Sequence, residues 1–185
     1  MKKYNIPTAA YENFDDPKAA LAYLETADFP IVLKADGLAL GKGVLICQDL
    51  DEAKAGVKEI MEDKKFGSAG NRLVIEEFMT GREVSVLSFV DGKNIRIMTS
   101  AQDHKRAGDG DTGLNTGGMG TFSPSPFYTE EVDSFCRKYI YQPTVDAMLA
   151  EGREFKGVIF FGLMLTEKEP GFWNIMPDLV IRRHR

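Results

Sequence analysis

Three stretches of the chain carry apolar residues at helical spacing, and each follows a residue type that is favoured at a helix N-terminus. The first has a proline at its first helical position, the second has Asp49 with Glu52 as a capping box, and the third has glutamates in its first turn. Pro143 should kink or divide the third helix near Gln142, because proline cannot donate a backbone hydrogen bond and its ring clashes with the preceding turn. We therefore expect helices to begin after Asp16, Asp49 and Thr129.

Short apolar runs bounded by glycine, proline or aspartate predict strands between and after these helices. Asp91-Gly92 is a hairpin signal, because glycine tolerates the positive φ that tight hairpin turns require. Strands alternate with helices early in the chain, and antiparallel hairpins follow. The pattern predicts an α+β protein of two lobes with a cleft between them, with strands at 30–34, 44–47, 73–78, 83–90, 94–100 and 157–165.

Composition narrows the class of protein. The chain has 185 residues, of which 43% are hydrophobic and 28% charged, as in a soluble globular protein that forms one domain or two small lobes. Its net charge of −5 argues against a nucleic-acid binder, and no apolar run approaches the length of a membrane span. The two cysteines, Cys47 and Cys136, are expected to be reduced core residues, and a cytoplasmic protein is predicted.

The richest chemistry lies in residues 102–120, which combine many glycines with basic and acidic side chains. Glycine lets a backbone lie close against a ligand, and Lys105 and Arg106 suit an anion such as phosphate. Gly108 to Gly113 matches a dinucleotide fingerprint as text, but its aspartates would face the pyrophosphate and no helix follows. A calcium loop is also rejected, because its final glutamate position holds Gly120. We infer a phosphate-handling loop.

A second glycine-rich turn runs from Lys34 to Gly43. It is not a P-loop, because the glycine spacing is short by one residue and Gly43 replaces the hydroxyl residue that would bind magnesium. It also joins two strands. We interpret it as a hairpin over phosphates, with Lys34 on the strand and Lys42 at the tip. A solvated hairpin explains the turn about equally well.

The strand that ends at Glu76-Glu77-Phe78-Met79 offers backbone hydrogen-bonding groups beside apolar side chains, which suits an adenine ring. Glu83 could accept hydrogen bonds from ribose hydroxyls. An ordinary acidic strand end is the alternative, and it would be preferred without neighbouring evidence. His104 has no nearby histidine or cysteine and is not interpreted as a zinc ligand.

Together these segments resemble the ATP-grasp part of the phosphoribosylamine–glycine ligase (glycinamide ribonucleotide synthetase) family. The resemblance runs from about residue 4 to residue 166. Its most specific motifs are Gln-Asp-His-Lys-Arg at 102–106 and Asn-Thr-Gly-Gly-Met-Gly at 115–120; others are Ile-Pro-Thr-Ala at 6–9, Lys-Ala-Asp-Gly-Leu-Ala at 34–39, Gly-Lys-Gly-Val at 41–44 and Val-Ile-Glu-Glu-Phe at 74–78.

The resemblance implies an α+β ATP-grasp fold and the ATP-dependent joining of glycine to phosphoribosylamine through a glycyl phosphate, in purine biosynthesis. It implies small-molecule substrates (ATP, glycine and phosphoribosylamine) and no nucleic-acid or membrane partner. By the same resemblance, phosphates and the reacting groups contact Lys34, Lys42, Asp103, His104, Lys105, Arg106 and Asn115, while the nucleoside contacts Glu76, Glu77, Phe78, Met79 and Glu83.

The chain departs from the family after residue 166. The family continues approximately as Val-Leu-Glu-Tyr-Asn-Ala-Arg-Phe-Gly-Asp-Pro-Glu-Thr-Gln, in which Glu and Asn bind Mg²⁺ or Mn²⁺. Suitable codons for that strand, translated from one base later, give Phe-Trp-Asn-Ile-Met-Pro-Asp-Leu-Val-Ile-Arg-Arg-His, which is the sequence of residues 172–184. We therefore expect an ATP-grasp domain over 1–166, a frameshift near 169–171 and an aberrant tail over 167–185. A basic binding tail at 182–185 is the alternative.

Several expectations follow from these departures. The family's metal ligands are missing, and Asn174 is not expected to replace them. Met1-Lys-Lys-Tyr resembles the middle of the family chain, so the domains on either side of the ATP-grasp part are expected to be absent. The sheet edge beside 157–165 should then be exposed. We expect an inactive ligase fragment, or alternatively a non-catalytic ATP-binding module. The Gln-Asp-His-Lys-Arg motif disfavours an ATP-grasp enzyme of the biotin carboxylase type.

Overall fold

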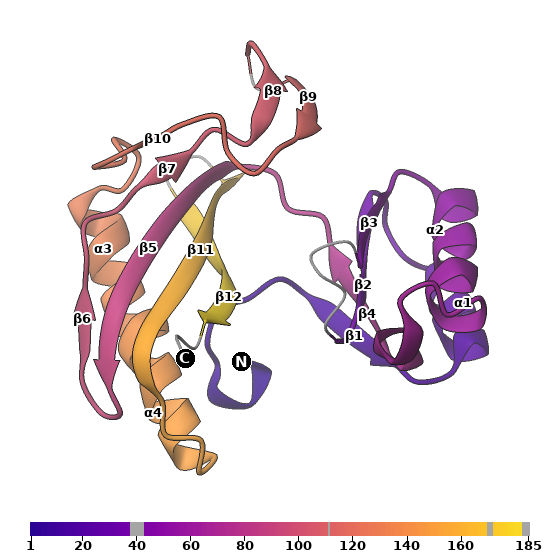
Figure 1. Cartoon of the computed structure of the whole chain (residues 1–185), viewed down its shortest axis with the longest axis horizontal. Coiled ribbons are helices and arrows are strands. Elements are labelled where there is room, and N and C mark those ends of the chain that lie inside the picture. The colour runs from indigo at the N-terminus through magenta and orange to yellow at the C-terminus, as the bar shows by residue number, and fades with distance from the viewer. Residues whose placement is uncertain (38–42, 111, 170–171, 183–185) are drawn as a thin grey trace. The chain divides into compact units, whose positions relative to one another are not determined.

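The computed structural model describes residues 1–37, 43–110, 112–169 and 172–182. The chain forms two compact units (Figure 1). One unit is Ala9–Met79, and the other combines Met1–Thr8 with Thr80–Arg185. None of the described helices is long and apolar enough to cross a lipid bilayer.

The unit Ala9–Met79 is a four-stranded antiparallel sheet with helices on one face (Figure 1). Leu33 and Leu73 are fully buried in its core, against Ala53 and Val57 of the second helix. The strands, in sheet order, are β1 (Tyr11–Phe14), β4 (Leu73–Glu77), β2 (Ile31–Ala35) and β3 (Val44–Cys47). The helical segments are α1 (Pro17–Leu24), α2 (Leu50–Val57), η2 (Lys58–Glu62) and η3 (Gly67–Asn71).

The other unit has its own four-stranded antiparallel sheet and its own core. The strand order is β12 (Phe172–Arg182), β11 (Lys156–Glu169), β5 (Arg82–Asp91) and β6 (Ile95–Ile97). One helical run covers one face of this sheet, and it consists of α3 (Glu130–Cys136), η4 (Arg137–Tyr141) and α4 (Gln142–Ala150) (Figure 1). Ile140 and Tyr141 of the run pack with Phe161 of the sheet, and all three are fully buried. A short N-terminal helix, η1 (Lys2–Tyr4), is tied to this unit where Lys3 and Tyr4 contact the Glu151 carboxylate.

Residues 102–122 form two nested antiparallel pairs rather than an irregular loop. The inner pair is β8 (Arg106–Gly108) with β9 (Thr112–Asn115), and the outer pair is β7 (Gln102–Asp103) with β10 (Thr121–Phe122). The β8–β9 hairpin extends beyond the end of the large sheet (Figure 1). Pairing was not predicted here, because the segment has no apolar alternation and its register is held by backbone hydrogen bonds.

The helix-start predictions are confirmed. The carboxylates of Asp16 and Asp49 accept hydrogen bonds from backbone N–H groups at 3.1 and 2.9 Å, and the Thr129 hydroxyl accepts one at 3.3 Å. The third helical run changes to a wider turn over η4 and restarts at Gln142, with Pro143 in the first turn of α4. The expected kink or division near Gln142 takes the form of this wider turn, and the run stays helical throughout.

Some strand expectations were wrong. The strand expected over 94–100 is regular only at Ile95–Ile97, and β1 was not predicted at all. The exposed edge expected beside 157–165 is also wrong, because β12 pairs antiparallel with β11 from Val158↔Arg182 to Glu169↔Phe172. Backbone groups alone form such a ladder, so residues 172–182 can complete the sheet whatever side chains they carry.

Candidate functional site

Lys34 and Glu76 come together on the open face of the small sheet. Lys34 lies on β2 and Glu76 on the neighbouring β4, and the Lys34 Nζ is 2.6 Å from Glu76 Oε2. Successive side chains of a strand point to opposite faces of the sheet. Leu33 and Ile75, which precede Lys34 and Glu76, are buried in the core, so the two charged side chains point to the other face. Both are largely shielded, with 28% and 21% of their side-chain surface exposed.

The same face continues as an aliphatic surface on β3. Val44 is directly opposite Lys34, and Ile46 is opposite Val32. Val44 and Ile46 are 49% and 47% exposed, which is high for aliphatic side chains in a sheet. An apolar surface beside an ammonium group can pack against a planar ring and hold an attached anion.

The end of β4 is fixed by reciprocal contacts with Ala10. The Ala10 N–H donates to Glu77 Oε1 at 2.9 Å, and the Glu77 N–H donates to the Ala10 carbonyl at 2.9 Å. Phe78 and Met79 follow without regular structure, are half-buried, and are the last residues of the small unit. The predicted adenine-binding segment is therefore a strand end whose direction is set by Glu77.

Glu83 and Lys105 come together in the other unit. Glu83 is near the start of β5, and Lys105 lies between β7 and β8. The Lys105 Nζ donates to Glu83 Oε2 at 2.5 Å, with 43% and 50% of the side chains exposed. Two residues predicted to contact different parts of a nucleotide thus form one ion pair.

Asp103 and His104 precede Lys105 on the same segment. Asp103 Oδ1 is buried and has no hydrogen-bond partner within the described residues. An unpartnered buried carboxylate oxygen costs free energy, and Gly118 lies against it, so a ligand could reach it only if the turn at 116–118 moved. The exposed His104 ring packs near Phe122, with a centroid distance of 5.4 Å.

The remaining predicted residues are less fully placed. Arg106 and Asn115 are register partners at the base of the β8–β9 hairpin. Lys42 lies outside the described residues. The predicted site residues therefore form two groups, one in each unit. Their convergence on one nucleotide stays a prediction.

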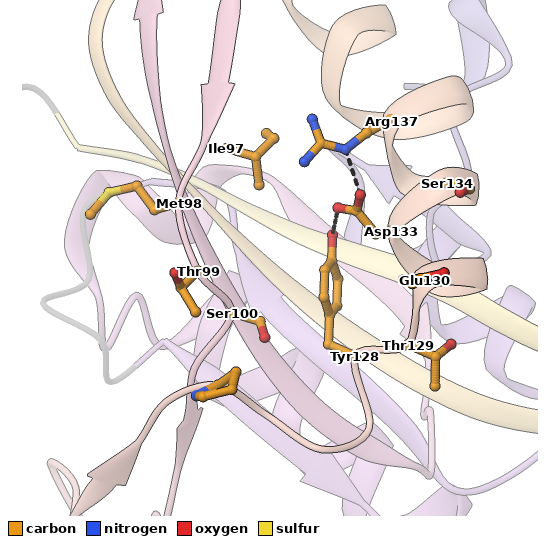
Figure 2. Close-up of a pocket in the computed structure, with 11 residues that line it drawn as sticks. Ile97, Met98, Thr99, Ser100, Tyr128, Thr129, Glu130, Asp133, Ser134 and Arg137 are labelled. Atoms are coloured by element: carbon orange, nitrogen blue, oxygen red, sulfur yellow. Dashed lines mark hydrogen bonds and ion pairs between the residues drawn. The ribbon is translucent and has the colours of Figure 1, made fainter.

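A separate cavity of about 640 Å³ lies beside α3, and no predicted site residue lines it (Figure 2). The Tyr128 hydroxyl donates to Asp133 at 2.9 Å, and Arg137 Nε donates to the other oxygen of that carboxylate at 2.5 Å. Tyr128 also shares a 2.6 Å hydrogen bond with the buried Tyr141 hydroxyl. These polar groups satisfy one another, which indicates a structural network.

Burial raises the pKa values of titratable side chains in both cores. Burial raises the pKa of the Cys136 thiol to about 12 and raises the pKa of the Tyr141 hydroxyl far above its usual value. Cys47, in the other core, has its pKa raised to about 11 by burial. Both cysteines are buried and free, as expected from the sequence.

Comparison with solved structures defines the class. D-alanyl-alanine synthetase A from Vibrio cholerae superposes with a TM-score of 0.69 at 12% identity, covering 96% of this chain and 50% of that one. A likeness at such low identity concerns the fold alone. Phosphoribosylamine–glycine ligase from Thermotoga maritima superposes with a TM-score of 0.83 at 32% identity, covering 97% of this chain and 44% of that one. The chain has an α+β ATP-grasp fold.

The family follows from the sequence comparisons. The chain belongs to the phosphoribosylglycinamide synthetase family, because the model of its ATP-grasp (A) domain matches residues 1–176. Phosphoribosylamine–glycine ligase from Pasteurella multocida is 51% identical over 165 residues, which is 89% of this chain and 38% of that relative. The chain thus spans less than half the length of the curated relatives it matches.

Proposed function

We propose that the chain is the nucleotide-binding part of a ligase that joins glycine to phosphoribosylamine at the expense of ATP. The observation that carries this proposal is the pairing of four residues expected at the nucleotide. Lys34 pairs with Glu76, and Lys105 pairs with Glu83. The family resemblance expects both lysines to contact an anionic ligand, and a carboxylate holds each of them in this structure.

The reaction needs charge neutralisation more than covalent chemistry from the protein. The γ-phosphoryl group of ATP passes to the glycine carboxylate, which gives an acyl phosphate and ADP. The phosphoribosylamine nitrogen then attacks the acyl carbon and loses a proton, and phosphate leaves. Lys34, Lys105 and Arg106 would balance the charge on the phosphates.

ATP-grasp ligases use a divalent metal, and the Glu and Asn that bind it in the family are expected to be missing from this chain. No group of three or more carboxylate, imidazole or thiol side chains lies together among residues 1–37, 43–110, 112–169 and 172–182. No step of the proposal therefore passes through a metal held by this chain. We expect little or no ligase turnover from the polypeptide alone, with nucleotide binding as its residual activity.

A thermal-shift experiment with ATP, with and without Mg²⁺, tests the proposal. Stabilisation by ATP without metal would support a nucleotide-binding module, and no response to either would contradict nucleotide binding. Steady phosphate release with ATP, glycine and phosphoribosylamine would support the ligase assignment and refute the expected inactivity. Guanosine triphosphate is the matched control, because it tests recognition of the base rather than of the phosphates.

A further inference from the structure

The Thr116 side chain connects the two arms of segment 102–122. Its backbone N–H and its hydroxyl both donate to the Lys105 carbonyl, at 2.7 and 2.9 Å. The same hydroxyl oxygen accepts from the Gly118 N–H at 3.0 Å. Among the described residues of this segment, Thr116 alone joins the Lys105 backbone to the turn at 116–118 through its side chain.

Two further backbone hydrogen bonds hold the chain next to Lys105. The Met119 N–H donates to the His104 carbonyl at 2.7 Å, and the His104 N–H donates to the Gly120 carbonyl at 2.9 Å. With the Thr116 contacts, the carbonyls of His104 and Lys105 are both fixed. The Lys105 side chain then extends to Glu83, with its Nζ 2.5 Å from the carboxylate.

The turn tolerates little change next to this contact. Gly118 has φ +118°, which residues with a side chain rarely adopt, and a Cβ there would lie 2.8 Å from Asp103 Oδ1. The turn therefore lies directly against the buried carboxylate oxygen that has no partner in the described residues. One hydroxyl at Thr116 thus adjoins both Lys105 and the turn that covers Asp103.

We propose that Thr116 is a positioning residue that orients Lys105 toward Glu83 and so sets where the ammonium group meets an anionic substrate. This inference rests on the proposed function, because Lys105 touches phosphate only if the chain binds a nucleotide. Thr116 itself need not contact substrate.

The test measures how fast Lys105 is acylated in the full chain, by treatment with an acetylating N-hydroxysuccinimide ester followed by peptide mass spectrometry. Thr116→Val keeps the shape and removes the hydroxyl, so Lys105 should react about twofold to tenfold faster, as expected for one lost hydrogen bond. Thr116→Ser keeps the hydroxyl and should react like the parent chain. Glu83→Gln sets the upper limit of the reaction rate.

Two internal controls separate positioning from stability. Thr112 also bonds a backbone carbonyl through its hydroxyl, at 2.8 Å to Asp109, but at the hairpin tip, so Thr112→Val should leave Lys105 unchanged. Lys65, paired with Glu59 at 2.5 Å in the other unit, should keep its rate in every variant.

An unchanged Lys105 rate in Thr116→Val, or an equal increase in Thr116→Ser, would overturn the proposal. So would an increase at Lys65 matching that at Lys105, because it would show general unfolding. The assay contains no nucleotide, so its outcome is independent of the ATP experiment. Failure of ATP binding with a selective change at Lys105 would refute the proposed function and leave the positioning intact.

Discussion

Replacing Lys34 by methionine tests the nucleotide assignment most directly. Methionine keeps an unbranched, apolar side chain at the position and removes the ammonium group. Lys34 is paired with Glu76 at 2.6 Å on the open face of the small sheet, next to the exposed Val44 and Ile46. If a triphosphate binds beside this aliphatic surface, Lys34→Met should weaken its binding.

The size of the effect follows from two opposing contributions. A hydrogen bond to a charged group stabilises by about 1.5–3 kcal/mol. To make it, Lys34 must give up part of its ion pair with Glu76, which costs about 1 kcal/mol, the upper end for exposed pairs, because both side chains are largely shielded. The net loss on substitution is about 1–2 kcal/mol, or roughly 5- to 30-fold in the dissociation constant.

The assay is a titration of ¹⁵N-labelled chain with ATP, followed by chemical shifts, because this method measures weak dissociation constants. Lys54→Met is the matched control, since Lys54 forms a 2.6 Å pair with Glu25 in the same unit but on the helical side. It should leave the dissociation constant unchanged. Glu76→Gln removes the charge that pairs with Lys34 and keeps the backbone of the strand end, so it tests the predicted contact of Glu76 with the nucleoside separately.

Equal dissociation constants for Lys34→Met and the parent chain would refute the assignment of Lys34 to the nucleotide. A similar weakening in Lys54→Met would also count against it, because it would indicate a general effect of net charge.

Three further outcomes are expected. Tyr141→Phe should lower the free energy of unfolding by about 1–2 kcal/mol in urea titrations, because it removes a buried hydroxyl that bonds the Tyr128 hydroxyl at 2.6 Å. Tyr139→Phe is the control and should change this free energy little, because Tyr139 is 41% exposed. Gly81→Ala should destabilise the fold by about 1–3 kcal/mol, because the new Cβ would lie 2.2 Å from the Leu165 carbonyl oxygen of β11. Gly117→Ala is the control, because a Cβ at that position would have no heavy atom within 4 Å. The Asn94 amide and neighbouring backbone N–H groups lower the pKa of Asp91 to about 2. The contribution of Asp91 to folding stability is therefore present above about pH 4 and lost as the pH falls toward 2. The melting temperature of Asp91→Asn should depend less steeply on acid pH than that of the parent chain, and an unchanged profile would contradict this.

Local chemistry made the helix starts predictable from sequence. Asp16, Asp49 and Thr129 cap helices with side-chain oxygens, and this depends on residues only two or three positions away. Pro143 acts locally too, so the place where the third helix changes its turn could be located. The family motifs named the candidate site residues. Four of them form two ion pairs that the sequence did not predict, and their contacts with a nucleotide stay a prediction.

Long-range pairing was harder to predict. The nested strands at 102–122 have no alternation of apolar and polar residues, and their register depends on contacts such as those of Thr116 with Lys105. A single threonine in a glycine-rich run gives no periodic signal. β1 is short and only partly buried, with its pattern set by its neighbour β4, so it too was invisible to periodicity.

The pairing of β12 depends on backbone groups, whereas metal binding depends on particular side chains. β12 pairs with β11 along most of its length, and Pro177, opposite Leu163, is tolerated because β12 is at the sheet edge, where one side of the backbone has no strand to bond. A ladder needs only backbone groups, whereas a metal site needs particular carboxylate and amide side chains at particular positions. If the reading frame changes near 169–171, the sheet can therefore keep its fourth strand while the family's ligands are lost. Restoring the family sequence over 172–185 should consequently change metal-dependent nucleotide binding far more than the melting temperature. A large gain in stability without any gain in Mg²⁺ dependence would contradict this separation of fold from chemistry.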